Sequence, residues 1–324
     1  MIVALPGPCD WINAALQVLA QDQQAVLALV CGKHGSTPRG TGSWVLLNEQ
    51  QILGSVGGGE LEHTMIEAGQ AMLAGNGDWS RSIMHCVLGS DMRQCCGGTM
   101  EVMLQPIDSG DRGWLQDAQA SLYRQDASRV AFDRVDSNVP PLVIVGSSPN
   151  PVVNENMFVL TLADPRPALA VFGAGHVGRA LCTIASQLPL RLTVFDQRPD
   201  QCALIPDSGN IEIDTALSPL HGARELTNHD AALIMTHSHA LDYELCRILL
   251  RQSALCYTGL IGSKSKAQRF RKVLKKDGLS DSQIAHLTSP IGVDGPVGKE
   301  PGMIALGVLG EILNTPRLTA QEAG

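Results

Sequence analysis

Hydrophobic residues in the first half of the chain follow two kinds of spacing. Behind Asp10 and again behind Glu60, apolar residues recur every three or four positions, which predicts two amphipathic helices, with Asp10 as N-cap of the first. Short apolar runs predict strands at residues 25–31, 44–47, 81–88 and 99–105. Because helices and strands do not alternate strictly, we expect a mixed α/β domain here.

In the second half, short apolar runs alternate regularly with helical patterns. Runs predicting strands occupy residues 169–172, 192–196, 231–235 and 257–261, and helical spacing occupies residues 177–187 and 241–251. Such alternation is typical of a parallel sheet with crossover helices. Six prolines between residues 137 and 167 mark the boundary, which predicts domains at residues 1–150 and 151–324.

Composition narrows the class of protein. A length of 324 residues suits about two domains at roughly 150 residues each. A net charge of -8 and only 4% aromatic residues argue against a nucleic-acid or membrane-surface partner. Nine cysteines without a CxxC pair, and an N-terminus without a signal-peptide pattern, favour a reducing compartment, so we expect a cytoplasmic protein.

A glycine motif follows the first predicted strand of the second half. Gly173, Gly175 and Gly178 form GxGxxG, with His176 inside it, and Asp196 ends the next strand 18 residues later. This order of strand, glycine turn, helix and acid predicts a Rossmann-like, doubly wound domain. The turn could bind a dinucleotide, hold another phosphorylated ligand, or serve only for packing.

Two histidines and an acid follow the strand predicted at residues 231–235. His237, His239 and Asp242 should therefore lie at the carboxyl edge of the sheet, where open α/β sheets bind ligands. Three interpretations stay open: hydrogen bonds to a ligand, helix capping and packing, or a metal site.

Two loops in the first half consist mainly of small residues. Residues 35–42 contain one cation, Arg39, and Gly57, Gly58 and Gly59 precede the helix that starts near Glu60. A glycine turn that opens a helix presents free backbone amides.

A third loop contains adjacent thiols. Cys95 and Cys96 follow Gln94 and precede two glycines. A thiolate here could contact a soft metal or a sulfur-bearing ligand, or both cysteines could be small buried residues at a strand start.

One segment concentrates positive charge. Residues 264–276 contain seven basic residues and no acid, and Ser263 precedes them. Either they form a solvated helix face, or they dock a partner or contact a ligand phosphate through the first lysines.

Taken together, these motifs resemble the XdhC/CoxI family, in its xanthine dehydrogenase accessory branch. The segments that carry the resemblance are residues 35–39, 56–62, 94–98, 171–178, 196–199, 236–242, 259–264 and 298–301. They follow the family order and span most of the chain. In the CoxI branch a cysteine often stands in the glycine turn where this chain has Gly59, so the resemblance leaves the metal-facing role to Cys95 or Cys96, with Cys96 as the expected molybdenum ligand.

The resemblance implies a chaperone rather than an enzyme. Such a protein binds molybdenum cofactor (molybdopterin), protects it during sulfuration by a cysteine desulfurase and delivers it to xanthine dehydrogenase; we also expect a homodimer, and a nucleotide at the Rossmann site stays possible. The expected cofactor-binding residues are Arg39, Gly58, Gly59, Glu60, Gln94, Cys95, Cys96, Gly173, Gly175, His176, Gly178, Asp196, Arg198, His237, His239, Ser263 and Lys264.

Two other function classes compete with the chaperone. Asp196 behind a GxGxxG motif is also typical of an NAD(P)-dependent oxidoreductase, although no hydride-transfer constellation is identifiable. A metal-dependent hydrolase would use His237, His239 and Asp242. Analysis of the cofactor and of the metal content of the purified protein would separate the three.

Overall fold

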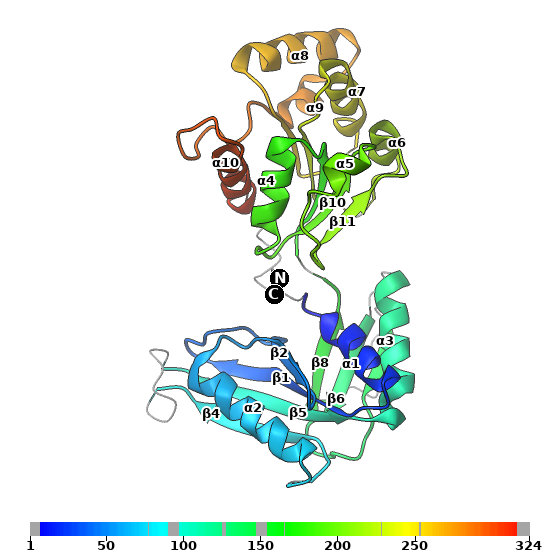
Figure 1. Cartoon of the computed structure of the whole chain (residues 1–324), viewed down its shortest axis with the longest axis vertical. Coiled ribbons are helices and arrows are strands. Elements are labelled where there is room, and N and C mark those ends of the chain that lie inside the picture. The colour runs from blue at the N-terminus through cyan, green and yellow to red at the C-terminus, as the bar shows by residue number, and fades with distance from the viewer. Residues whose placement is uncertain are drawn as a thin grey trace. The chain divides into compact units, whose positions relative to one another are not determined.

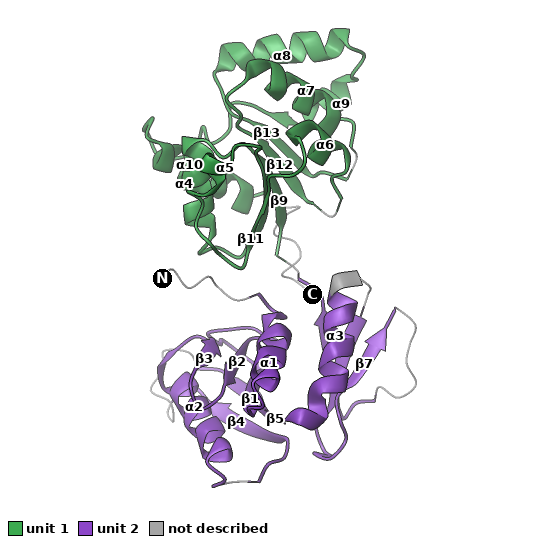
Figure 2. Cartoon of the chain, turned by 45° about the vertical axis from the view of Figure 1, so that its right-hand side comes forward, with its two compact units in different colours: residues 1–5, 165–324 green, residues 6–164 purple. Residues whose placement is uncertain are grey.

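The chain folds into two compact units, shown in Figures 1 and 2. The computed structural model describes residues 7–76, 78–89, 97–124, 128–146, 154–164, 166–227, 229–252 and 254–315. The division falls between Asp164 and Pro165, and not at the expected position after residue 150. The reason is strand β8 (Met157–Leu162), which pairs antiparallel with β6 (Ser128–Asp133) and so belongs to the first unit. We call residues 6–164 the N-terminal unit and residues 165–324 the C-terminal unit.

The N-terminal unit is built on an antiparallel five-stranded sheet in the order β3-β2-β1-β5-β4. Its strands are β1 (Ala25–His34), β2 (Trp44–Leu47), β3 (Ile52–Gly54), β4 (Ser82–Val87) and β5 (Thr99–Ile107). A second sheet has the order β7-β6-β8, with β7 at Leu142–Val145. The unit is therefore the mixed α/β domain that the hydrophobic pattern predicts.

Strand β1 is buried on both faces and separates two apolar cores. Leu27 and Leu29 pack into the core under α1 (Asp10–Ala20) and α3 (Arg112–Arg124), which the three-stranded sheet closes. Val26 and Val30 face the other core, under α2 (Gly59–Leu73). A short 3₁₀ turn, η1 (Ser109–Asp111), links β5 to α3.

Helix α1 begins one residue earlier than expected. Asp10 is its first residue, and the N-cap position belongs to Cys9. The Asp10 carboxylate accepts a hydrogen bond from the Gly7 amide, so it stabilises the chain before the helix and does not cap its first turn.

The C-terminal unit confirms the Rossmann-like prediction. Six parallel strands have the order β11-β10-β9-β12-β13-β14, with the reversal of order on either side of β9 that defines a doubly wound sheet. Their bounds are β9 (Ala168–Phe172), β10 (Arg191–Phe195), β11 (Ile211–Asp214), β12 (Ala231–Ile234), β13 (Tyr257–Leu260) and β14 (Leu287–Thr288).

Helices cover both faces of this sheet (Figure 1). They are α4 (His176–Ala185), α5 (Pro199–Cys202), α6 (Pro219–Arg224), α7 (His239–Leu249), α8 (Lys264–Lys276), α9 (Asp281–Ala285) and α10 (Pro301–Leu313). Leu169 and Val171 of β9 pack toward α4 and α10, whereas Phe172 packs toward α7 and α8. A continuous apolar strand between two helical layers follows from burial on both faces.

Seven cysteines lie in the described ranges, and all are free thiols. Burial raises the pKa of Cys31 to about 11 and of Cys182 to about 12, so these thiols stay protonated at neutral pH and pack as small apolar residues. No helix within the described ranges is long and apolar enough to cross a bilayer.

Candidate functional site

Three loops of the N-terminal unit gather at one end of the five-stranded sheet. The antiparallel register brings the ends of β1, β3 and β4 to the same end as the starts of β2 and β5. The Gly98 amide donates to the Ser36 carbonyl at 3.1 Å, and a Cβ built on Gly57 would lie 2.8 Å from Pro38 Cβ. The two small-residue loops and the end of the Cys loop are therefore packed against one another.

The glycine turn before α2 depends on positive φ angles. Gly57, Gly58 and Gly59 have φ of 113°, 75° and 72°, a region that side chains with a Cβ rarely adopt. The carboxylate of Glu62 accepts from the Val56 and Gly58 amides, at 2.9 and 3.1 Å, and so holds the turn.

Glu62 is a site residue that the sequence analysis did not single out. Burial raises its pKa, but hydrogen bonds from Ser55 and the turn amides, together with the charge of Arg39, outweigh that effect and lower it overall. Glu60, the expected residue, is exposed. A carboxylate in the first turn of a helix behind a glycine N-cap is the signal that could have identified Glu62.

The thiol loop cannot be placed in the same way. Gln94, Cys95 and Cys96 lie outside the described residues, so their roles stay predictions. Arg39 is described, is exposed, and lies beside the glycine turn.

In the C-terminal unit the GxGxxG loop follows β9, and its three glycines differ in role. A Cβ on Gly173, whose φ is 120°, would lie 2.6 Å from the Met235 carbonyl oxygen, and one on Gly178 would lie 2.1 Å from the Gly173 carbonyl oxygen. A Cβ on Gly175 would meet no described atom within 4 Å. Gly173 and Gly178 therefore allow close packing of strand and helix, and Gly175 leaves open space at the start of α4, where His176 is exposed.

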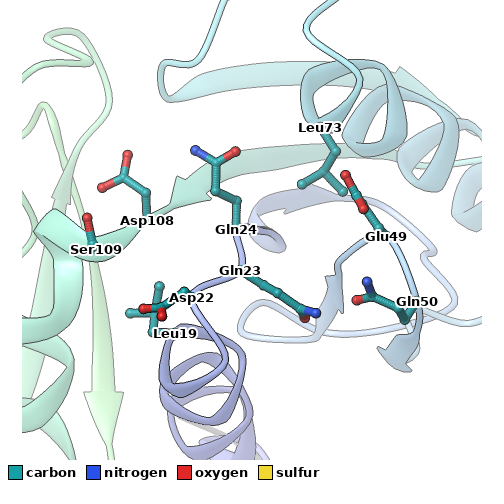
Figure 3. A pocket seen from close by; sticks show the side chains of 9 residues that line it. All are labelled: Leu19, Asp22, Gln23, Gln24, Glu49, Gln50, Leu73, Asp108 and Ser109. Carbon is teal, nitrogen blue, oxygen red and sulfur yellow. The ribbon is translucent and has the colours of Figure 1, made fainter.

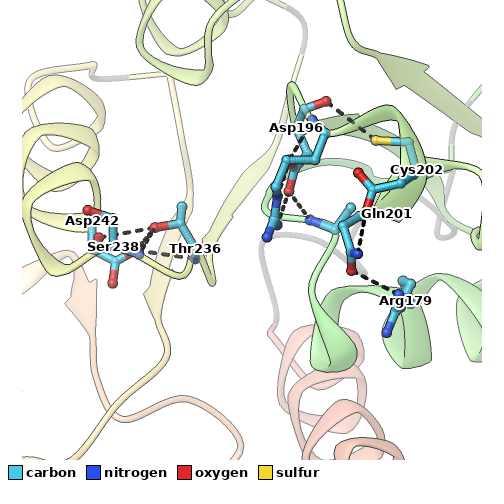
Figure 4. Close-up of polar contacts among 10 residues, drawn as sticks. Arg179, Asp196, Gln201, Cys202, Thr236, Ser238 and Asp242 are labelled. Atoms are coloured by element: carbon cyan, nitrogen blue, oxygen red, sulfur yellow. Dashed lines mark hydrogen bonds and ion pairs between the residues drawn. The ribbon is translucent and has the colours of Figure 1, made fainter.

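Asp196, at the end of β10, is bound within the protein (Figure 4). Its Oδ2 accepts from the Ala174 amide of the glycine loop at 2.7 Å, and its two oxygens together accept three hydrogen bonds from Arg198. Burial raises the pKa of this carboxyl, yet these hydrogen bonds lower it overall, so Asp196 stays ionised. Asp196 and Arg198 thus tie the end of β10 to the glycine loop.

The segment after β12 contains a buried ion pair. Asp242 accepts from Thr236 Oγ1 at 2.7 Å and from Lys266 Nζ at 2.6 Å, and Lys266 also donates to the Ile261 carbonyl. The side chains of Asp242 and Lys266 are only 1% and 11% exposed. This contact joins the segments that follow β12 and β13. Like Glu62, Lys266 has a structural role that the sequence analysis did not assign.

The histidines beside it do not join Asp242 in a ligand set. His237 and His239 are exposed, and Ser238 caps α7 by accepting from the Leu241 amide. Within the described ranges no group of three histidine, cysteine or acidic side chains could hold a metal ion. Of the three interpretations of this segment, capping and packing applies to Ser238 and Asp242. The imidazoles of His237 and His239 are exposed and accessible to a ligand.

The basic segment forms α8, whose N-terminus lies at the same edge of the sheet. Ser263 caps it by accepting from the Lys266 amide, and Lys264 is exposed. Of the other basic residues, Lys275 pairs with Asp281 and Arg271 donates to the Leu287 carbonyl. The exposed members are Lys264, Arg269, Lys272, Lys275 and Lys276.

A cavity of about 500 Å³ lies elsewhere, at the opposite end of the N-terminal sheet (Figure 3). It lies between the α1–β1 connection, the β2–β3 turn and the end of β5, and none of the expected site residues lines it. Its lining side chains are mainly carboxylates and amides: Asp22, Gln23, Gln24, Glu49, Gln50, Asp108 and Ser109, with Leu19 and Leu73.

The described motifs thus collect in two places, one in each unit. Loops 35–43, 55–59 and the end of the Cys loop form one, and the carboxyl edge of the parallel sheet forms the other. The fold and this edge define the class of protein: an α/β protein of two units, one of which is a Rossmann-type domain whose sheet has its carboxyl edge available for a ligand.

Comparison with known families gives the particular family. Residues 169–312 match the model of the XdhC Rossmann domain, and residues 18–81 match the model of the XdhC and CoxI family. The chain belongs to the XdhC/CoxI family. The first match contains the whole glycine loop and Asp196, and the second contains the loop with Arg39 and the glycine turn.

Individual relatives extend over nearly the whole chain. A Bacillus subtilis protein, named as a probable xanthine dehydrogenase subunit, is 25% identical over 95% of this chain and 98% of its own length. An uncharacterized Escherichia coli protein is also 25% identical, but this chain spans only 45% of it. The crystal structure of a Bacillus halodurans protein described as a xanthine dehydrogenase has the same fold, with a TM-score of 0.74, 24% identity and 98% coverage of both chains.

Proposed function

We propose that this protein is an accessory protein of xanthine dehydrogenase that binds molybdenum cofactor, keeps it intact during sulfuration by a cysteine desulfurase, and passes it to the dehydrogenase. Membership of the XdhC/CoxI family and the Bacillus subtilis relative named for xanthine dehydrogenase support the association with that enzyme. We assign no catalytic residue, because the role is to hold and transfer a cofactor.

The observation that carries the proposal is the open space at Gly175. Molybdenum cofactor is an anionic pterin with a terminal phosphate and a dithiolene-held metal. Space without a Cβ at the start of α4 lets an anion approach the backbone amides of the helix N-terminus closely. Arg198, Lys264 and the exposed His237 and His239 supply further donors along the same edge.

In this proposal, the metal end of the cofactor requires a different kind of ligand. Molybdenum held by sulfur suits a thiolate, so Cys96, with Cys95 second, remains the proposed contact. Glu62 keeps the neighbouring glycine turn in place, and Arg39 contributes a cation beside it.

Pterin analysis of the purified protein tests the proposal. The chain would be produced in cells that make molybdenum cofactor, purified, denatured, and analysed for released pterin, nucleotides and metals. We expect close to one molybdopterin per chain and transfer of it to apo-xanthine dehydrogenase. Release of a nicotinamide nucleotide without pterin would instead support the oxidoreductase, and a stoichiometric divalent metal without pterin would support the hydrolase.

A further inference from the structure

The carboxylate of Asp196 has no acceptor position left for a ligand. Its Oδ1 accepts from Arg198 N at 3.1 Å and Arg198 Nε at 2.9 Å, and its Oδ2 accepts from Ala174 N at 2.7 Å and Arg198 Nη2 at 2.5 Å. A carboxylate offers about four lone-pair positions. In dinucleotide-binding Rossmann domains, an acid at the end of this strand accepts from the hydroxyls of the adenosine ribose. Here that capacity is already used by the protein.

What this strand end presents to a ligand is the guanidinium of Arg198. Its side chain is 35% exposed, compared with 9% for Asp196. Its Nε and Nη2 donate to Asp196, whereas Nη1 makes no hydrogen bond to any described residue. Guanidinium groups bind phosphate oxygens with several directed hydrogen bonds, and they do not accept from a diol.

Neighbouring contacts hold this arrangement in place. Arg198 immediately precedes α5, and the thiol of Cys202 in α5 donates to the Asp196 carbonyl at 3.4 Å. Arg179 of α4 donates to Gln201 at 2.9 Å, which fixes α5 against the helix that follows the glycine loop (Figure 4). The carboxylate therefore cannot turn toward a ligand without loss of the contacts between β10, α5 and the glycine loop.

We propose that Arg198, bound to Asp196, determines the ligand class of the C-terminal Rossmann site: it excludes ligands that need a carboxylate for an unmodified ribose diol and selects ligands that present a phosphate monoester. This inference rests on the proposed function only in that the edge binds a phosphorylated ligand. The phosphate monoester could belong to a pterin cofactor or to a 2′-phosphorylated nucleotide.

Two nucleotide probes test the selectivity on the full chain. Isothermal titration would compare NAD⁺, which has a free ribose diol, with 2′,5′-ADP, which has a phosphate monoester at that position. We expect the unmodified protein to bind 2′,5′-ADP at least tenfold more tightly than NAD⁺. In Arg198→Ser, the freed Asp196 carboxylate should accept hydrogen bonds from the ribose hydroxyls. The variant should therefore bind NAD⁺ more tightly than 2′,5′-ADP.

Two further variants separate this effect from damage to the fold. Arg198→Lys keeps a cation and should retain part of the preference, because an ammonium cannot bind phosphate with two parallel hydrogen bonds. Arg224→Ser removes an exposed arginine at the end of α6 and should leave the ratio unchanged. Equal or absent binding of the two nucleotides, or a ratio that Arg198→Ser does not move in a folded protein, would overturn the inference.

Pterin content distinguishes this inference from the proposed function. If 2′,5′-ADP is preferred but no pterin co-purifies, the selectivity stands and the cofactor-binding proposal fails. If pterin co-purifies with the unmodified protein and the nucleotide ratio is insensitive to Arg198, the cofactor-binding proposal stands and this inference fails. A severalfold lower pterin content in Arg198→Ser than in Arg224→Ser would assign the selected phosphate to the pterin.

Discussion

Substitution of Gly175 by valine should abolish ligand binding by the C-terminal unit while leaving its fold intact. Gly175 is the N-cap of α4, with φ −71° and ψ −172°, an extended conformation that valine adopts. A Cβ there meets no described atom within 4 Å, so the first carbon of the valine side chain has room. Valine is a poorer N-cap than glycine, so we expect a loss of unfolding free energy of about 1 kcal/mol or less.

The expected loss of affinity is much larger than this loss of stability. A valine side chain would occupy the space through which a phosphate approaches the amides at the start of α4. Charge-assisted hydrogen bonds contribute about 1.5–3 kcal/mol each, so loss of two of them would cost about 3–6 kcal/mol. This corresponds to an affinity at least ~100-fold lower.

Two other glycines supply controls. Gly178→Ala would place a Cβ 2.1 Å from the Gly173 carbonyl oxygen, and we expect it to destabilise the unit by about 3 kcal/mol. Gly209, in the turn before β11 at the opposite edge of the sheet, also has open space around a Cβ, so Gly209→Val should change neither stability nor binding.

The assay combines urea unfolding with titration calorimetry. Urea unfolding establishes that Gly175→Val is folded, and calorimetry then measures its affinity for the cofactor and for nucleotides. Undiminished affinity of a well-folded Gly175→Val for both classes of ligand would refute the reasoning, because it would place the phosphate away from the helix amides.

Three further predictions concern the thiol loop, the buried ion pair and the basic helix. Cys96→Ala should lower molybdopterin retention during purification, and Cys95→Ala should lower it less; retention at the parent level with both replaced would rule out thiol ligation. Lys266→Met should lower the unfolding free energy by about 3–5 kcal/mol, because it leaves the buried Asp242 without its cation. In the same helix Lys275→Met, which removes an exposed pair with Asp281, should change it by only about 0.5 kcal/mol, and equal effects in urea unfolding would contradict the assigned roles. Reversal of Arg269, Lys272, Lys275 and Lys276 to Glu should slow association with an acidic partner surface on the dehydrogenase or desulfurase and weaken its salt dependence, with cofactor binding unchanged. Activation of apo-dehydrogenase at the parent rate across a range of salt concentrations would show that α8 is only a solvated face.

The sequence by itself determined the Rossmann-like half and the position of its ligand edge. Those features are local: continuous apolar strands, helical spacing and GxGxxG lie within short segments, and parallel strands bring their carboxyl ends to one edge. In the first half the same signals located α1, α2, β1, β2, β4 and β5, but they did not predict α3 or the strands of the second sheet, β6, β7 and β8. Short elements such as β3 and β14 gave too few residues for periodicity to show.

Only the tertiary structure decided which distant segments pair. The unit boundary moved beyond residue 150 because β8 pairs with β6, and hydrophobic periodicity shows which face of a strand is buried but not its partner. Asp196 binds Ala174 across 22 positions, and Asp242 binds Lys266 across 24. From the sequence alone, Asp196 behind the glycine motif and Lys266 in the basic segment both look available to a ligand. Whether each one meets a ligand or another side chain depends on contacts that form only when the strands and helices are assembled.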